Sequence, residues 1–159
     1  MTTVSIRKAT ADDAAASFAI RREAIRAQCP GHYPAEDLEA WTAGTISETF
    51  ARRVAETFYV ATVDDAAVGT GMIDLKTGKL DAIFVLPGHM GHGIGRALVE
   101  YLETLAVDAG LDAIHLEATL NAAPFYRVLG FEGETRSVYE STLGVRLACV
   151  PMSKMLRTL

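Results

Sequence analysis

Hydrophobic and polar residues recur with regular periods over the N-terminal part of this 159-residue chain. Residues 3–7 alternate between the two kinds, which predicts a half-buried strand. Thr10 can cap a helix over 11–28, whose apolar residues recur at helical spacing and which a Pro-Gly pair follows. A second helical region is expected over 35–55, with an interruption near Gly44.

The middle of the chain predicts three strands connected by short turns. Segments rich in β-branched and aromatic residues cover 57–63, 67–76 and 80–86. Asp64-Asp65 and Thr77-Gly78 provide the turns between them. Because turns this short connect antiparallel neighbours, we expect three consecutive antiparallel strands.

The C-terminal part predicts a strand–helix–strand unit, then a shorter helix and two further strands. Ile94, Leu98 and Leu102 share one apolar face of the longest expected helix. The expected elements are helix 94–109, strand 111–119, helix 121–129, strand 131–139 and strand 145–155. Antiparallel strands that lead into a single βαβ crossover give a mixed sheet with helices on both faces.

The expected element order is therefore β-α-α-β-β-β-α-β-α-β-β. The predicted fold class is α+β (mixed α/β), with a central mixed sheet of about seven strands. No repeat or linker divides the chain, so we expect a single domain over 1–159. Half of the residues are hydrophobic and 22% are charged, which is typical of a soluble globular chain and excludes a disordered one.

The charge and cysteine content of the chain indicate which kinds of ligand it binds and in which cellular compartment it is expected. Fifteen basic and 20 acidic residues give a net charge of −5, which argues against nucleic acid as a partner and mildly favours cationic acceptors such as amines. The widely separated Cys29 and Cys149 indicate ordinary buried thiols in a reducing compartment. With no recognisable secretory signal or membrane-spanning run, we expect a cytoplasmic protein without a membrane partner.

The most informative segment for chemistry is a glycine-rich stretch between a strand and a helix, at 88–95. Free backbone N–H groups and the helix dipole at such a helix start favour a phosphate or pyrophosphate. The phosphate loop of nucleoside triphosphatases requires lysine where Ile94 stands, and the dinucleotide fingerprint requires a small residue where Arg96 or Leu98 stands. Both of these phosphate-binding motifs are therefore excluded by spacing.

The stretch Met90-Gly91-His92-Gly93-Ile94-Gly95, which follows Val85-Leu86-Pro87, resembles the acetyl-CoA signature of the GCN5-related N-acetyltransferase (GNAT) superfamily. That signature is Gln/Arg-x-x-Gly-x-Gly/Ala, so Met90 is a departure from it. Residues 116–131 resemble a second block of the family, and 151–156 resemble a common family ending. The resemblance thus covers nearly the whole chain.

The resemblance implies an enzyme that moves an acetyl group from acetyl-CoA to an amine of a small molecule or a peptide N-terminus, by direct attack in a ternary complex. The strands on either side of the glycine loop would splay into a V-shaped cleft. Amides of 91–96 would bind the CoA pyrophosphate, and the backbone of 83–85 would pair with the pantetheine arm and polarise the thioester carbonyl. The implied cofactor-binding residues are Ile83, Phe84, Val85, Met90, Gly91, His92, Gly93, Ile94, Gly95, Arg96, Asn121 and Tyr126.

The resemblance also implies the catalytic groups. Tyr126 matches the tyrosine that protonates the departing CoA thiolate; the alternative is a core aromatic, a role open also to Phe125. Glu117 and Asp81 are the candidates for the general base, and each is otherwise an ordinary strand-end carboxylate. Asn121 either binds pantetheine or caps the following helix.

Histidines and aromatic residues complete the candidate set. His89 and His92 lack further ligands at zinc spacing, so no metal is expected, and His115 is either a base or relay or a buried histidine. The family's acceptor pocket would be lined here by Gln28, Cys29, His32, Tyr33, Trp41 and Tyr139.

Two other functions compete with the enzyme. A non-catalytic acyl-CoA-binding or sensor module would keep the glycine loop, and the departure at Met90 is compatible with it. A protein that uses the fold only to associate with a partner would not bind CoA at all. Members of the family often form homodimers, which this composition also allows.

Overall fold

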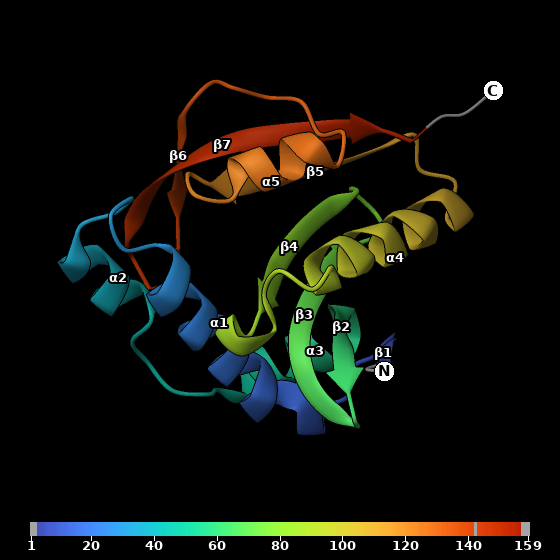
Figure 1. Ribbon diagram of the computed structural model, residues 1–159, viewed down its shortest axis with the longest axis horizontal. Coiled ribbons are helices and arrows are strands. Elements are labelled where there is room, and N and C mark those ends of the chain that lie inside the picture. The colour runs from blue at the N-terminus through green and yellow to red at the C-terminus, as the bar shows by residue number, and fades with distance from the viewer. Residues whose placement is uncertain (1–2, 142, 157–159) are drawn as a thin grey trace.

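The computed structural model describes residues 3–141 and 143–156. Within them, seven strands form one sheet in the order β1-β2-β3-β4-β5-β7-β6, and the fold is of the mixed α+β class that the sequence predicts (Figure 1). The strands are β1 (Val4–Lys8), β2 (Phe58–Val63), β3 (Ala66–Asp74), β4 (Lys79–Val85), β5 (Ala113–Thr119), β6 (Ser137–Glu140) and β7 (Arg146–Met155). The helices are η1 (Ala11–Asp13), α1 (Ala14–Gln28), α2 (Ala35–Trp41), α3 (Glu48–Thr57), η2 (Pro87–His89), α4 (Ile94–Asp108) and α5 (Ala123–Val128).

Helices cover both faces of the sheet. Leu98 and Leu102 of α4 are fully buried, in clusters with Val68 of β3 and Leu80 of β4, as the helical periodicity predicts. On the opposite face, Val54 of α3 is buried in a cluster with residues of β2 and β3. The sheet is therefore the middle of three layers, with helices packed on each of its two faces.

Strands β4 and β5 are parallel neighbours that pair only at their beginnings. Their register contains the single pair Lys79 and His115, and the His115 N–H donates to the Gly78 carbonyl at 3.0 Å. Beyond this pair the strands diverge, and Figure 1 shows β4 curving away from β5 and α5. The V-shaped divergence that the family resemblance implies is therefore present.

Several expected boundaries are wrong. The expected interruption near Gly44, whose φ is +97°, is present, but it divides the region 35–55 into two separate helices, α2 and α3. Three helices therefore separate the first two strands, where two were expected, and 11–13 form a 3-10 turn. The strand expected over 131–139 is shorter, because β6 begins at Ser137. Of residues 131–136, only Glu132 forms a bridge to β7. Among the described helices, none is long and apolar enough to span a membrane.

Gly78 fixes the point where β4 and β5 meet, and its replacement tests that role. Its φ is +82°, and a Cβ there would lie 2.7 Å from the Ala113 carbonyl oxygen. We predict that Gly78→Ala lowers the free energy of unfolding by about 3 kcal/mol or more, since left-handed alanine costs about 1–2 kcal/mol and overpacking adds to it. Gly110→Ala is the matched control, because Gly110 has φ +84° and open space around it. Equal losses for the two variants in urea unfolding would contradict this.

Candidate active site

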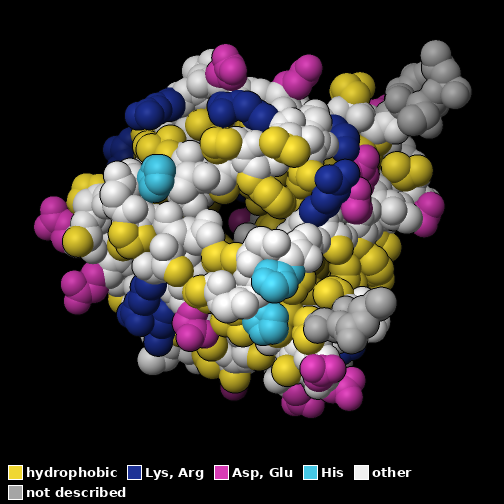
Figure 2. Space-filling view, viewed as in Figure 1, with side chains coloured by type: hydrophobic (Ala, Val, Ile, Leu, Met, Phe, Trp, Pro, Cys, Tyr) yellow, Lys and Arg dark blue, Asp and Glu magenta, His cyan; other side chains and the backbone are white. Residues whose placement is uncertain are grey.

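Two cavities meet where β4 and β5 diverge. Their volumes are about 310 and 320 Å³, close to the lower limit of ordinary small-molecule sites. The first lies between β4, β5, β6 and the helices α1 to α3, and the second follows the glycine loop and the start of α4. Figure 2 shows a hollow near the centre of this face, rimmed by hydrophobic side chains. Both cavities are lined by Ile83, Phe84, Thr119, Ala122 and Tyr126.

The glycine loop presents unpaired backbone amides to the second cavity. Gly93 is the N-cap of α4 with a left-handed φ of +82°, and the Ala97 N–H donates to its carbonyl at 3.0 Å. The amides of residues 94–96 precede that first helical hydrogen bond, so they have no acceptor within the helix. Together with the positive end of the helix dipole, they favour an anion here.

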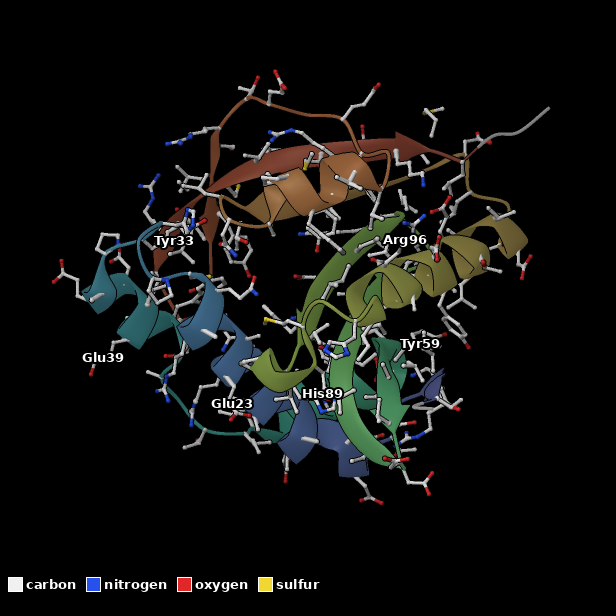
Figure 3. The ribbon with its side chains drawn as sticks, viewed as in Figure 1. Glu23, Tyr33, Glu39, Tyr59, His89 and Arg96 are labelled. Carbon is white, nitrogen blue, oxygen red and sulfur yellow. The ribbon has the colours of Figure 1, made fainter. Side chains whose placement is uncertain are left out.

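The second cavity gathers nearly all the predicted cofactor-binding residues. His92 is the exception, because it is exposed and does not line the cavity. Figure 3 shows His89 in η2 and Arg96 on α4, and both line this cavity. The predicted residues that line it are Ile83, Phe84, Val85, Met90, Gly91, Gly93, Ile94, Gly95, Arg96, Asn121 and Tyr126.

A β-bulge changes the direction of β4 just before Ile83 and Phe84, which line both cavities. Thr70 of β3 pairs with Phe84 and Met72 pairs with Asp81, so β4 has one extra residue between these pairs. Ala82 lies in this bulge with φ +53°, and its carbonyl accepts a 2.7 Å hydrogen bond from the Thr70 hydroxyl. A bulge bends its strand and turns the local backbone. The buried Thr70 hydroxyl therefore holds the backbone beside both cavities in place.

Tyr126 is the buried aromatic residue of α5. Its side chain is 7% exposed and packs edge to face against Phe125 and Phe131, with ring centroids 5.1 and 5.6 Å apart. Its hydroxyl has no hydrogen-bond partner among the described residues, and burial raises the pKa of Tyr126 above its ordinary value. Phe125 is 38% exposed, so it is not the core aromatic of this helix; it lies beside Gly95 instead.

Two carboxylates face the first cavity, and each forms an ion pair. Glu117 Oε1 lies 3.0 Å from Lys79 Nζ, and Asp81 Oδ2 lies 3.4 Å from Arg53 Nη2. Burial disfavours the charged form of Lys79, but the hydrogen bond to Glu117 raises the pKa of Lys79 overall. The second oxygen of Asp81 accepts a hydrogen bond from the Ala82 N–H at 2.8 Å. The structure therefore brings both base candidates to one cavity, each paired with a cation.

Asn121 lines the second cavity rather than capping α5. The N-cap of α5 is Ala122, so of the two roles considered for Asn121, pantetheine binding or helix capping, the structure excludes the cap. Its side-chain oxygen accepts from the Cys29 thiol at 3.4 Å. Both cysteines are buried free thiols, as expected, and burial raises the pKa of Cys29 to about 11. Gln28 reaches across from α1, and its side-chain amide contacts the Met90 sulfur.

The predicted acceptor wall is only partly assembled. Tyr33, Trp41 and Tyr139 line the first cavity, whereas Gln28 and Cys29 line the second. The Tyr33 hydroxyl donates to the Ala148 carbonyl and accepts from the Leu120 N–H. Tyr33 therefore also connects the loop between α1 and α2 to the sheet.

The prediction for two histidines is wrong. His32 and His115 are exposed and line neither cavity, so His115 is neither a buried histidine nor a residue of the site. Among the described residues, no group of three His, Cys, Asp or Glu side chains is placed to hold a metal ion.

Three cations that line the first cavity were not predicted from the sequence: Arg21, Arg53 and Lys79. Arg21 lies three residues after Phe18 and four before Ile25 on α1. A charged residue at that spacing falls on the same helix face as its apolar neighbours, which is the signal that identifies it.

Comparison with known proteins identifies the family. The family model "Acetyltransferase (GNAT) family" matches residues 19–131, so the chain belongs to this family of acetyltransferases. The chain is 38% identical over 66 residues to the uncharacterized N-acetyltransferase YjcF of Bacillus subtilis (strain 168). That match covers 40% of this chain and 47% of YjcF, so it spans about half the length of the relative.

Solved structures share the fold over nearly the full chain. A GCN5-related N-acetyltransferase from Rhodopseudomonas palustris superposes with a TM-score of 0.88 at 28% identity and covers 96% of both chains. The PaiA N-acetyltransferase from Thermoplasma acidophilum, solved in complex with coenzyme A, has a TM-score of 0.76 at 20% identity. The latter match covers 96% of this chain and 99% of that one, and shows the fold alone.

Removal of the Thr70 hydroxyl tests whether it holds the bulge. We predict that Thr70→Val lowers the free energy of unfolding by about 1–3 kcal/mol, because the partly buried Ala82 carbonyl loses this partner. Thr70→Ser keeps the hydroxyl and should recover most of that loss. Chemical denaturation of the three proteins measures the difference. A valine variant as stable as the wild type would show that the hydroxyl does not hold the bulge.

Proposed function

We propose that this protein transfers the acetyl group of acetyl-CoA to the amine of a small molecule, by direct attack in a ternary complex. The observation that carries the proposal is the meeting of the two cavities at Tyr126. Free amides lie on one side of that meeting point and carboxylates on the other. Membership of the GNAT family and the coenzyme A complex of the Thermoplasma acidophilum protein support the choice of donor.

The donor would bind through backbone groups. Amides of residues 91–96 take the pyrophosphate, which explains how an acidic chain can hold a phosphorylated ligand. The pantetheine arm pairs with residues 83–85, where β4 has separated from β5 and its backbone lines the second cavity. Met90 contributes no charge in this arrangement, so its difference from the family signature is compatible with binding.

The proposed reaction consists of one nucleophilic attack and two proton transfers. The neutral amine nitrogen attacks the thioester carbonyl carbon, whose oxygen accepts a hydrogen bond from a backbone N–H of the bulged segment. The carbon–sulfur bond breaks, and the Tyr126 hydroxyl gives its proton to the CoA sulfur. Glu117 takes the amine proton through water, with Asp81 as the second candidate. Tyr126 regains a proton from solvent before the next turnover.

The environment of Tyr126 suits an acid. Burial raises the pKa of its hydroxyl, which keeps the proton in place until a thiolate forms. The departing thiolate is desolvated by the same surroundings, so its pKa rises as well. The rise in the pKa of the thiol offsets the rise in the pKa of the tyrosine, which favours proton transfer between them.

Replacement of Tyr126 tests the acid directly. We predict that Tyr126→Phe lowers kcat by about 10²-fold while the affinity for CoA changes little, because the hydroxyl acts only on the leaving thiolate. Thiol release from acetyl-CoA, with aminoglycosides, polyamines, amino acids and peptides as acceptors, provides the assay. Tyr59→Phe is the matched control, since Tyr59 lines neither cavity. Normal turnover by Tyr126→Phe would remove the tyrosine from the mechanism.

The pH dependence gives an independent check. A raised tyrosine pKa means that the protonated donor form persists to higher pH, so kcat should show no decline below about pH 10 from loss of this proton. The measurement is kcat against pH with saturating acceptor, in wild type and Tyr126→Phe. An alkaline decline centred below about pH 9, absent from the variant, would contradict the assignment.

The competing function is a non-catalytic acyl-CoA-binding module. It predicts that acetyl-CoA raises the melting temperature while no acceptor in the panel releases thiol. The two carboxylates that line the first cavity together with Tyr126 favour the enzyme, because a binding module has no use for a proton acceptor there.

A further inference from the structure

The charges that line the first cavity do not cancel. Arg53 pairs with Asp81 at 3.4 Å, and Lys79 pairs with Glu117 at 3.0 Å. Arg21 also lines the cavity, but no described carboxylate lies within 4.0 Å of its guanidinium. The cavity therefore has one cation more than its anions can pair.

Arg21 is held in position by uncharged groups. Its Nη2 donates to the Trp41 carbonyl at 2.8 Å, and its guanidinium carbon lies 5.6 Å from the centre of the Trp41 ring. The side chain is partly buried on α1, and burial lowers the pKa of its guanidinium. Among the described residues, its other N–H groups have no hydrogen-bond acceptor. A guanidinium uses such groups to bind a carboxylate through two parallel hydrogen bonds.

The rest of the cavity suits a small and partly apolar molecule. Its volume is about 310 Å³, and aromatic side chains line it beside the charged groups. Tyr139 lines the cavity together with all of its charged side chains, so the charged groups surround one space. The aromatic lining consists of Phe18, Tyr33, Trp41, Phe50, Phe58, Phe84, Tyr126 and Tyr139.

We propose that the acceptor is an amino acid whose carboxylate binds Arg21 while its amine faces Glu117 and Tyr126. The proposal rests on the proposed function, whose acceptor class it narrows. It also replaces the preference for purely cationic amines that net charge alone suggests, because the local excess in the cavity is positive although the chain carries −5. The apolar lining favours amino acids with aromatic or aliphatic side chains.

The test compares amines that differ only in the carboxylate. The pairs are phenylalanine with phenethylamine, tyrosine with tyramine, and leucine with 3-methylbutylamine, titrated calorimetrically into the protein at saturating CoA. We expect the carboxylate to improve affinity at least about tenfold in the best pair, as a charge-assisted bidentate contact would. Equal affinities, tighter binding of the decarboxylated amines, or no amino-acid binding up to about 10 mM would overturn the proposal.

Two arginine variants separate recognition from folding. Arg21→Met should abolish the carboxylate preference and raise KM for the amino acid, with little change for its decarboxylated partner. Arg22→Met is the matched control, because Arg22 also donates to backbone carbonyls and lies over an aromatic ring but does not line the cavity. A preference that survives Arg21→Met overturns the proposal. Carboxylate-dependent binding without thiol release would refute the proposed function and leave this recognition standing.

Discussion

Strands β4 and β5 pair in register at Lys79 and His115 only, and the candidate site depends on their divergence beyond that pair. A parallel pair in the middle of a sheet ordinarily fills the space between its strands with hydrogen bonds and side chains. Here that space becomes two joined cavities, and the backbone of β4 is left free to bind. The left-handed Gly78 sets the starting point, because no side chain fits between the strands there.

The backbone of β4 adds a second constraint to this geometry. The bulge at Ala82 keeps a non-glycine residue at positive φ, which costs of the order of 1–3 kcal/mol. A partly buried hydrogen bond from the Thr70 hydroxyl holds it there. Ala82 lines the first cavity and directly precedes Ile83 and Phe84, which line both cavities. Backbone strain placed beside a site in this way is characteristic of preorganised binding surfaces.

The sequence predicted the sheet and most of the second cavity, because both depend on local signals. Helical periodicity identified α4, and the glycine spacing located the free amides at its start. The bulge at Ala82 was missed because alanine at positive φ has no signature in the sequence. The expectations for His32 and His115 were wrong for a different reason. The exposure of a side chain depends on which face of its element packs against a neighbour, and tertiary packing decides this. Helical spacing places Arg21 on the apolar face of α1, but the cavity that gives it a role forms only when α1, α2 and β6 come together.

If the divergence of β4 and β5 creates a binding site for acetyl-CoA, as proposed, the backbone along β4 and the glycine loop must contact the ligand. Titration of isotope-labelled protein with acetyl-CoA, followed by backbone amide resonances in two-dimensional NMR, tests it most directly. We expect saturable shifts at the amides of residues 83–85 and 91–96, with the edge strand β1 unaffected. Absence of saturable shifts, or shifts confined to another surface, would contradict it.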